Sequence, residues 1–136
     1  MNKSSKIVNI SVAGSAGRMG KMLVNAVHSH PECSLVAATC HPSESEVIGK
    51  DAGLVSGLDY INVPISSNPK DLIKADVIID FTAPEATINN SNLAVENKTG
   101  HVAYRIVFLR HHYIHPPLAR NLPCFLYKGV IQRLGL

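Results

Sequence analysis

A glycine-rich stretch near the start of the chain has the composition of a phosphate-binding turn. It reads Val12-Ala13-Gly14-Ser15-Ala16-Gly17-Arg18-Met19-Gly20. Between a strand and a helix, such glycines let the backbone approach a pyrophosphate, and the free N–H groups at the helix start bind its oxygens. The spacing Gly-x-x-Gly-x-x-Gly differs from the commoner Gly-x-Gly-x-x-Gly, and the alternative is a turn that only packs a helix closely on a strand. The stretch predicts a dinucleotide site at residues 14–20.

The position where such sites usually carry an acidic residue holds no carboxylate in this chain. About twenty residues beyond the turn, at the end of the second strand, an Asp or Glu ordinarily accepts the adenosine ribose hydroxyls. Here the residues are Thr39, Cys40 and His41. Cys40 and His41 are therefore candidate cofactor-binding residues, with His41 either near a 2′-phosphate or solvated in a polar loop. The sequence does not choose between NADH and NADPH.

A carboxylate, Asp80, ends an apolar run and is followed by Thr82 and Pro84. Open α/β sheets bind ligands at the carboxyl ends of their strands, which makes Asp80 a candidate for catalysis. An acid at a strand end before Thr and Pro is more typical of a cap or loop anchor, so we assign no catalytic residue. We also predict no metal site, because His111 and His115 have neither a helical pattern nor a carboxylate partner.

The elements that must position these residues alternate between strands and helices. Apolar, β-branched runs predict strands over residues 7–13, 34–39, 61–65 and 76–81, the third at a sheet edge because of its proline. Helical spacing or a proline start predicts helices over residues 18–29, 68–74 and 84–97, the last with Ala86, Ile88, Leu93 and Val95 apolar. A further strand is suggested at His101-Val102. The alternation predicts an α/β fold, a doubly wound parallel sheet of the Rossmann type.

Length and composition restrict the class of protein. At 136 residues, 46% of them hydrophobic, the chain fits one soluble domain with a substantial core. It has no apolar stretch of membrane-spanning length and no secretory signal pattern, so we expect a cytoplasmic protein with no membrane partner. The three cysteines fit reduced thiols. The net charge of +3 is small and belongs to residues 103–136, which contain no Asp or Glu, and no nucleic-acid partner is predicted.

Three motifs together resemble a known family. They are the turn at residues 14–20, Gly49-Lys50-Asp51-Ala52-Gly53, and Ile79-Asp80-Phe81-Thr82-Ala83-Pro84-Glu85. With these motifs in this order, the chain is similar to 4-hydroxy-tetrahydrodipicolinate reductase, also called dihydrodipicolinate reductase, from about Ile7 to Val102. The resemblance implies a bacterial-type oxidoreductase of the diaminopimelate route to lysine. It implies that NADH or NADPH reduces a cyclic small-molecule substrate, and that the intact protein is a homotetramer.

Carried over residue by residue, the resemblance implies the contacts of the nicotinamide dinucleotide. The residues around the pyrophosphate would be Gly14, Gly17, Arg18, Met19 and Gly20, with Ser15 and Ala16 in the same turn. Phe81 and Thr82 would lie beside the nicotinamide ring. The acidic ribose-binding residue of the family falls near Cys40 and is not matched here.

The resemblance ends after Val102. The family continues into a Gly-Thr-Thr-Gly turn and a substrate-binding domain with a His-His pair, a catalytic Lys and a Pro-Ser-Gly-Thr loop, none of which this chain matches. We therefore expect a dinucleotide-binding domain over residues 1–102, in an incomplete sheet. We expect residues 103–136 to be an irregular, non-family tail, frameshifted or disordered, in a truncated and catalytically incomplete chain. The alternative is a nucleotide-binding or interaction module whose basic tail contacts an acidic partner, with no enzymatic activity.

Overall fold

Strands and helices alternate through residues 6–103, the part of the chain that the computed structural model describes; the predicted tail from residue 104 onward lies outside it. The strands are β1 (Val8–Ala13), β2 (Cys33–Thr39), β3 (Ile65–Ser66), β4 (Val77–Asp80) and β5 (Gly100–Ala103). The helices are α1 (Arg18–Ser29), α2 (Ala52–Val55) and α3 (Pro84–Glu96), with a 3₁₀ helix, η1, at Pro69–Lys74. The strand suggested at His101-Val102 is present and extends to Ala103.

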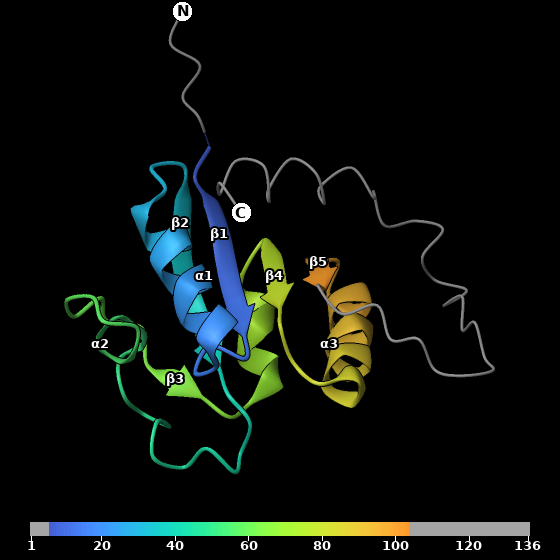
Figure 1. Ribbon diagram of the computed structural model, residues 1–136. Helices are drawn as coiled ribbons and strands as arrows, with labels where there is room; N and C mark the ends of the chain where they lie inside the picture. Colours follow the sequence, from blue (N-terminus) through green and yellow to red (C-terminus); the bar gives the residue numbers. More distant parts are fainter. Residues whose placement is uncertain (1–5, 104–136) are drawn as a thin grey trace, which may run out of the picture.

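The strands form one sheet in the order β3-β2-β1-β4-β5, and every pairing is parallel. Figure 1 shows β2, β1, β4 and β5 following one another across the molecule. Because β2 and β3 lie on one side of β1 while β4 and β5 lie on the other, the strand order reverses between β1 and β4. Open α/β sheets hold their ligands at such a reversal, beyond the carboxyl ends of the strands. The predicted doubly wound parallel sheet is confirmed.

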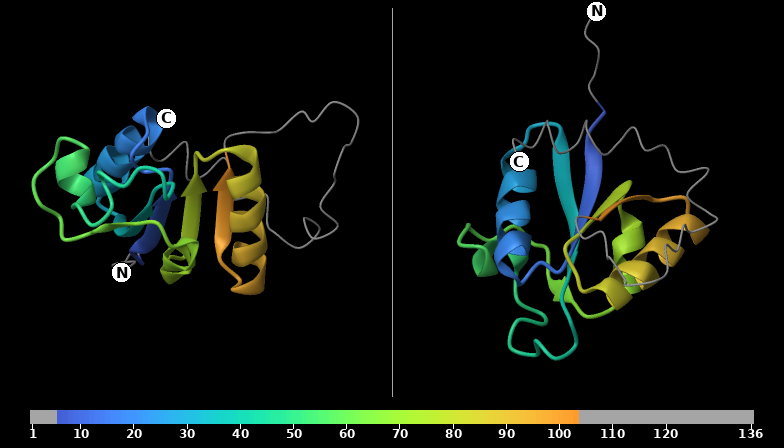
Figure 2. Two further views of the ribbon diagram at one scale, coloured as in Figure 1. Left: turned by 90° about the horizontal axis from the view of Figure 1, so that it is seen from below. Right: turned by 45° about the vertical axis from the view of Figure 1, so that its right-hand side comes forward.

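Both faces of the sheet are covered, because successive strand residues point to opposite sides. On one face, Ile10 and Val12 of β1 are fully buried and cluster with the apolar side of α1, formed by Leu23, Val24 and Val27. On the other face, Ala13 clusters with Leu72 of η1, Ile78 of β4 and Ala94 of α3. Figure 2 shows α1 and α3 separated by the strands. The sheet is therefore the rigid platform for the loops at its carboxyl edge.

Only the last residue of the predicted strand 61–65 lies in a strand. The residues before Ile65 donate their N–H groups to a buried carboxylate. Asp51 Oδ1 accepts the N–H of Ile61 at 3.1 Å, and Asp51 Oδ2 accepts the N–H of Val63 at 2.9 Å. The proline that follows Val63 has no N–H to donate. Pairing with β2 is left to Ile65 and Ser66, at the edge of the sheet as predicted.

One apolar residue of helix α3 is exposed, and one of its polar residues is buried. Ile88 is 51% exposed, whereas the buried residues of the helix are Asn90 and Ala94. Asn90 is turned inward because its Nδ2 donates to Asp80 at 2.9 Å. The helix is therefore where the sequence predicts it, but it is oriented in part by a polar contact that periodicity does not detect.

Candidate functional site

The turn between β1 and α1 is held by the end of β2. Gly14 has a φ of +79°, a left-handed conformation that glycine adopts without strain. The carbonyl oxygen of Thr39 accepts the N–H groups of Gly14 at 3.0 Å and Ser15 at 2.9 Å, and the Ser15 hydroxyl at 3.0 Å. Ser15 is consequently buried, and Ala16 packs against the hydrophobic core. The side chains of these two residues, both predicted cofactor contacts, support the turn from inside.

Gly17 and Gly20 differ in what the fold requires of them. A Cβ on Gly20 would collide with the carbonyl oxygen of Gly14, whereas a Cβ on Gly17 would lie 3.6 Å from that oxygen, an ordinary contact. The φ of Gly17 is −72°, which any residue adopts. Packing within the protein therefore explains the glycine at position 20 but not the one at 17. A phosphate group that approaches the backbone closely needs this open space over Gly17.

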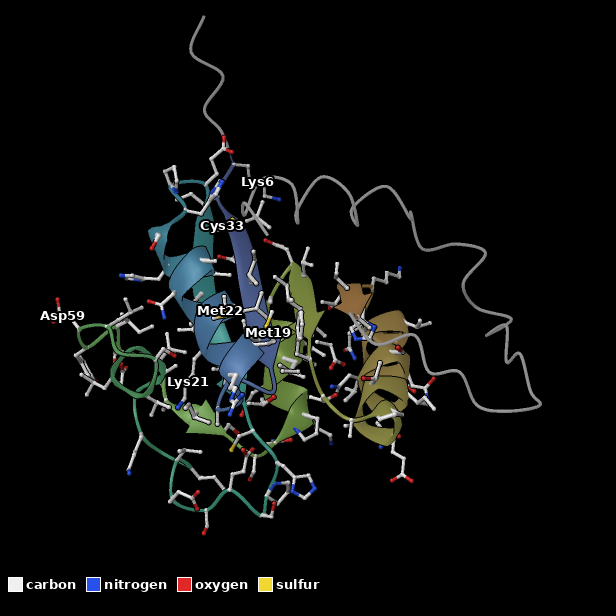
Figure 3. All side chains as sticks on the ribbon, in the orientation of Figure 1. Lys6, Met19, Lys21, Met22, Cys33 and Asp59 are labelled. Atoms are coloured by element: carbon white, nitrogen blue, oxygen red, sulfur yellow. The ribbon has the colours of Figure 1, made fainter. Side chains whose placement is uncertain are left out.

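The first turn of α1 presents backbone donors without acceptors in the helix. Gly17 is the N-cap and has no side chain to cap the helix, and the first turn contains no acidic residue. The N–H groups of Arg18, Met19 and Gly20 precede the bond from Lys21 to the Gly17 carbonyl, so none has an intrahelical acceptor. Figure 3 shows Met19 and Lys21 at this end of the helix. With the positive end of the helix dipole, these donors form a site for an anion.

Two adjoining hollows form a cleft at the carboxyl edge of the sheet. The larger has a volume of about 570 Å³, and the smaller, of about 370 Å³, lies at the start of α1. Both are lined by Gly14, Gly17, Phe81, Thr82 and Ala83. The larger adds Cys40 and His41, and the smaller adds Arg18, Met19 and Gly20. All the predicted cofactor contacts except Ser15 and Ala16 thus come together in this cleft.

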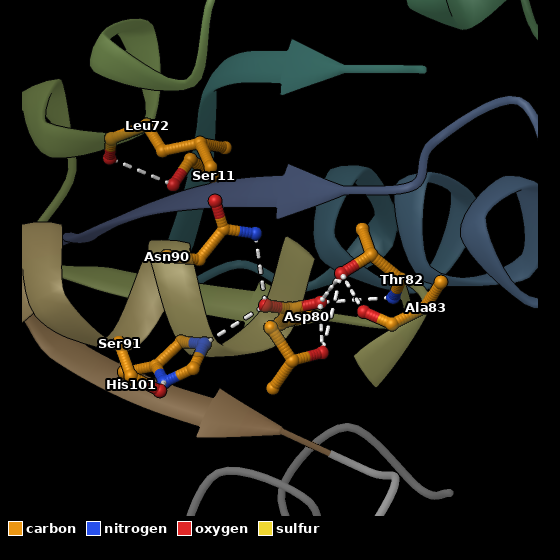
Figure 4. A network of polar contacts seen from close by, with 9 residues as sticks. Ser11, Leu72, Asp80, Thr82, Ala83, Asn90, Ser91 and His101 are labelled. Carbon is orange, nitrogen blue, oxygen red and sulfur yellow. Dashed lines mark hydrogen bonds and ion pairs between the residues drawn. The ribbon is translucent and has the colours of Figure 1, made fainter. Parts of the chain in front are cut away.

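Asp80 is the centre of a buried polar network at the end of β4, shown in Figure 4. Its Oδ1 accepts the N–H and the hydroxyl of Thr82 at 2.8 and 2.6 Å. Its Oδ2 accepts Asn90 Nδ2 at 2.9 Å and lies 3.0 Å from His101 Nε2. Burial raises the pKa of Asp80, but hydrogen bonds from His101, Thr82 and Asn90 outweigh it and hold the pKa below its usual range. Asp80 is an ionised anchor for the loop at Thr82, the role that the sequence favours over catalysis.

Cys40 and His41, at the end of β2, have different environments. Cys40 is 7% exposed, and burial, followed by the charges of Glu44 and Glu46, raises the pKa of its thiol. His41 is exposed, and its Nδ1 accepts the N–H of Ser43 at 3.1 Å. In the neutral ring the proton therefore lies on Nε2, which remains a donor. This edge of the cleft offers a neutral thiol and an imidazole N–H.

Several residues that are not predicted as cofactor contacts also line the larger hollow. They extend it from the end of β2 to η1 and α3, and they are Thr39, Pro42, Ser43, Glu44, Ser67, Pro69, Ala83, Ala86 and Asn90. Asn90 could have been found from the sequence, because it lies one turn before the buried Ala94, on the same side of the helix. No such signal existed for Glu44, which lies in a loop whose sequence indicates only polarity. The cleft is therefore larger than the predicted contacts alone.

Residues 6–103 contain neither a cluster of metal ligands nor a membrane-spanning helix. No three His, Cys, Asp or Glu side chains of this part of the chain group as a metal ion requires. The helices of this part lack the length and the apolar composition of a membrane span. Cys40 is a free thiol, whereas His111 and His115 lie outside the described residues.

Comparison with known proteins identifies a family. Residues 8–103 match the family described as "Dihydrodipicolinate reductase, N-terminus". The chain is 44% identical over 96 residues to the 4-hydroxy-tetrahydrodipicolinate reductase of Afipia carboxidovorans, a match that covers 70% of this chain and 35% of that protein. It is 37% identical over 100 residues to the reductase of the same name from Rhizobium rhizogenes, covering 73% and 36%. The chain therefore spans about a third of the length of the curated relatives it matches.

Solved structures share the fold at lower identity. A dihydrodipicolinate reductase from Paenisporosarcina sp. TG-14 with dipicolinate bound has a TM-score of 0.56 at 24% identity, over 71% of this chain and 37% of that one. An aspartate semialdehyde dehydrogenase from Candida albicans with NADP has a TM-score of 0.57 at 15% identity, over 72% and 29%. At these identities the structures establish the fold alone. The match over residues 8–103 establishes more, and this chain belongs to the dihydrodipicolinate reductase family, of which it carries the N-terminal region.

Proposed function

We propose that this chain is the NADH- or NADPH-binding part of a 4-hydroxy-tetrahydrodipicolinate reductase in the diaminopimelate route to lysine. The observation that carries the proposal is the cleft at the strand-order reversal, with the open start of α1 on one side and Phe81 and Thr82 on the other. The bound dinucleotide supplies a hydride for reduction of the cyclic substrate. We place the protein in the cytoplasm, and the full-length family protein in a homotetramer.

In the proposed complex, each part of the cleft holds one part of the dinucleotide. The N–H groups of Arg18, Met19 and Gly20 donate to the pyrophosphate oxygens, and Gly17 leaves them room to approach. Phe81 and Thr82 lie beside the nicotinamide ring. Because Thr82 is tied to the buried Asp80 by its N–H and its hydroxyl, this wall of the cleft is fixed before a ligand arrives.

We propose in addition that residues 1–136 bind the dinucleotide without turning over substrate. Reduction needs a proton donor for the reduced substrate and groups that hold it against the nicotinamide. The titratable side chains that line the described cleft are Arg18 at the start of α1 and Cys40, His41 and Glu44 at the end of β2. Asp80 and His101 are buried in their own network. The titratable groups that line the described cleft therefore lie at the start of α1 and the end of β2, and none lies on the loop of Phe81, Thr82 and Ala83 that follows β4.

Calorimetric titration of the 136-residue chain with NADH and NADPH tests the binding proposal. We expect saturable binding, and we expect Gly17→Asp to weaken it by at least about tenfold, since a carboxylate would occupy the anion site at the helix start. The variant should fold, because the backbone at position 17 suits any residue and has room for a Cβ. Asp is also a favoured N-cap residue and should stabilise the helix.

Two further measurements complete the test. Gly17→Ala adds a methyl group without charge and separates crowding of the phosphate from repulsion. Circular dichroism shows whether the wild-type chain is folded. If the folded chain binds neither dinucleotide, the binding proposal is contradicted. Reduction of the family's substrate by the 136-residue chain would contradict the proposed lack of turnover while leaving binding intact.

A further inference from the structure

The end of β2 is the edge of the cleft that faces the adenosine ribose in the proposed function. In dinucleotide-binding sheets a carboxylate at this strand end usually accepts the ribose hydroxyls. Here the strand ends at Thr39, and the next residue, Cys40, is a buried thiol whose pKa is raised by that burial. A neutral thiol is a weak hydrogen-bond acceptor. The usual position therefore does not supply the acceptor that a ribose needs.

Glu44 places a carboxylate at this edge of the cleft. Its N–H donates to the His41 carbonyl oxygen at 2.9 Å, and the His41 N–H donates to Glu44 Oε2 at 3.0 Å. These reciprocal bonds fold the Glu44 side chain back onto the residue that directly follows Cys40. Glu44 is partly buried and lines the larger hollow. Within the described residues Oε1 accepts no hydrogen bond, so this oxygen is open to a ligand.

The charges around this part of the cleft oppose a second phosphate group. No Lys or Arg of the described residues lines the larger hollow, and His41 already uses its Nδ1 as an acceptor for Ser43. The charge of Glu44 acts at this edge, since after burial it is the next cause of the raised pKa of Cys40. A 2′-phosphate would meet this carboxylate with no fixed cation to offset the repulsion. Two ribose hydroxyls would instead donate to it.

We propose that Glu44 recognises the adenosine ribose and makes this chain selective for NADH over NADPH. The inference rests on the proposed function and adds the residue that determines cofactor preference. It assigns that role to a loop residue four positions beyond Cys40, where the strand-end pattern predicts no carboxylate. The exposed Glu46 belongs to the same loop but does not line the hollow, so it provides a matched comparison.

The test is a calorimetric titration of the 136-residue chain and two variants, Glu44→Gln and Glu46→Gln, with NADH and NADPH at one ionic strength. We expect the wild-type chain to bind NADH at least about tenfold more tightly than NADPH, the typical effect of one hydrogen bond to a charged group. Glu44→Gln should reduce this ratio about tenfold, with weaker NADH binding and tighter NADPH binding. Glu46→Gln, at an exposed position, should leave the ratio within about twofold.

The outcomes separate this inference from the function on which it rests. Equal binding of NADH and NADPH by the wild-type chain, or an unchanged ratio in Glu44→Gln, overturns the role of Glu44 and leaves the binding function standing. The same change in both variants also overturns it, because selectivity would then come from the charge of the loop rather than from a contact made by Glu44. A folded wild-type chain that binds neither dinucleotide overturns the proposed function, and this inference with it.

Discussion

Among the single residues, Asp80 makes the stability of the protein sensitive to acid. Burial raises its pKa, but hydrogen bonds from His101, Thr82 and Asn90 lower it overall. A carboxyl whose pKa is lowered on folding contributes stability above its unfolded pKa of about 3.9 and loses it as the pH falls through the lower folded value. We therefore expect the free energy of unfolding, measured with urea, to decrease steadily as the pH falls below about 5. Asp51 and Asp71, whose pKa values are also lowered, add to the decrease.

The variant Asp80→Asn isolates the contribution of Asp80. Its amide would place a donor against Asn90 Nδ2 or His101 Nε2, leaving a buried donor unpaired, so we expect a loss of about 1–3 kcal/mol at pH 7. The decrease at low pH should become smaller. Asp59→Asn, on an exposed loop residue visible in Figure 3, is the control and should change neither quantity by more than about 0.5 kcal/mol. Wild-type stability and an unchanged acid response in Asp80→Asn would refute the anchoring role.

The sequence predicts one end of the candidate site better than the other. Glycines that follow a buried strand and open a helix have few uses, so the role of residues 14–20 as a turn at the cleft follows from spacing alone. The edge at β2 does not follow from spacing. Glu44 lines the cleft because of reciprocal hydrogen bonds with His41, and such bonds within an irregular loop leave no periodic signal.

At the scale of secondary-structure elements, Asp51 organises the connection from β2 to β3. Its carboxylate accepts four backbone N–H groups, those of Gly53, Leu54, Ile61 and Val63. Burial raises its pKa and these four bonds lower it overall. We expect Asp51→Asn to lower the free energy of unfolding by about 1–3 kcal/mol in urea, because an amide cannot accept all four. Lys50→Gln changes the exposed neighbour and should leave the urea midpoint unchanged; equal midpoints for both variants would argue against Asp51 as the organiser.

The sequence predicts the elements that apolar packing stabilises better than those that hydrogen bonds stabilise. Strands β1, β2 and β4 and helix α1 are held by apolar residues at regular spacing, and the sequence predicts them within a residue or two of their bounds. The sequence pattern does not predict α2, whose four residues are too few to show a helical period. It begins β3 too early because Ile61 and Val63 donate their N–H groups to the distant Asp51. On α3 the apolar Ile88 is exposed while the polar Asn90 is buried, because Asn90 donates to Asp80.

At the scale of the whole molecule, the cleft joins the two halves of the sheet. The larger hollow reaches from β4 across β1 to the end of β2 and η1, and the smaller lies at the start of α1. Phe81 and Thr82, which follow β4, line both hollows. A ligand that fills both therefore contacts elements on either side of the strand-order reversal. Such a ligand should stabilise the folded chain more than two separate molecules that each fill one part.

Thermal unfolding of the 136-residue chain tests this use of the whole cleft. NADH at one hundred times its Kd should add about 2.7 kcal/mol to the free energy of unfolding, which raises the Tm by roughly 10 °C for a domain of this size. AMP and nicotinamide mononucleotide together, each at the concentration used for NADH, should raise the Tm far less. Two separate ligands each lose translational freedom on binding, whereas the covalent link makes the second contact intramolecular.

The variant Gly17→Asp is the control for this comparison and, at the same NADH concentration, should show at most about half the rise in Tm, because its site for the linking pyrophosphate is weakened at least about tenfold. If AMP alone raises the Tm as much as NADH does, the ligand uses only the edge at β2, and the nicotinamide half of the cleft contributes no binding energy in this chain. If the mixture of AMP and mononucleotide equals NADH, both hollows bind but the pyrophosphate contact at α1 adds nothing. The expected order, NADH well above the mixture, requires the start of α1 to hold the pyrophosphate while both hollows are filled.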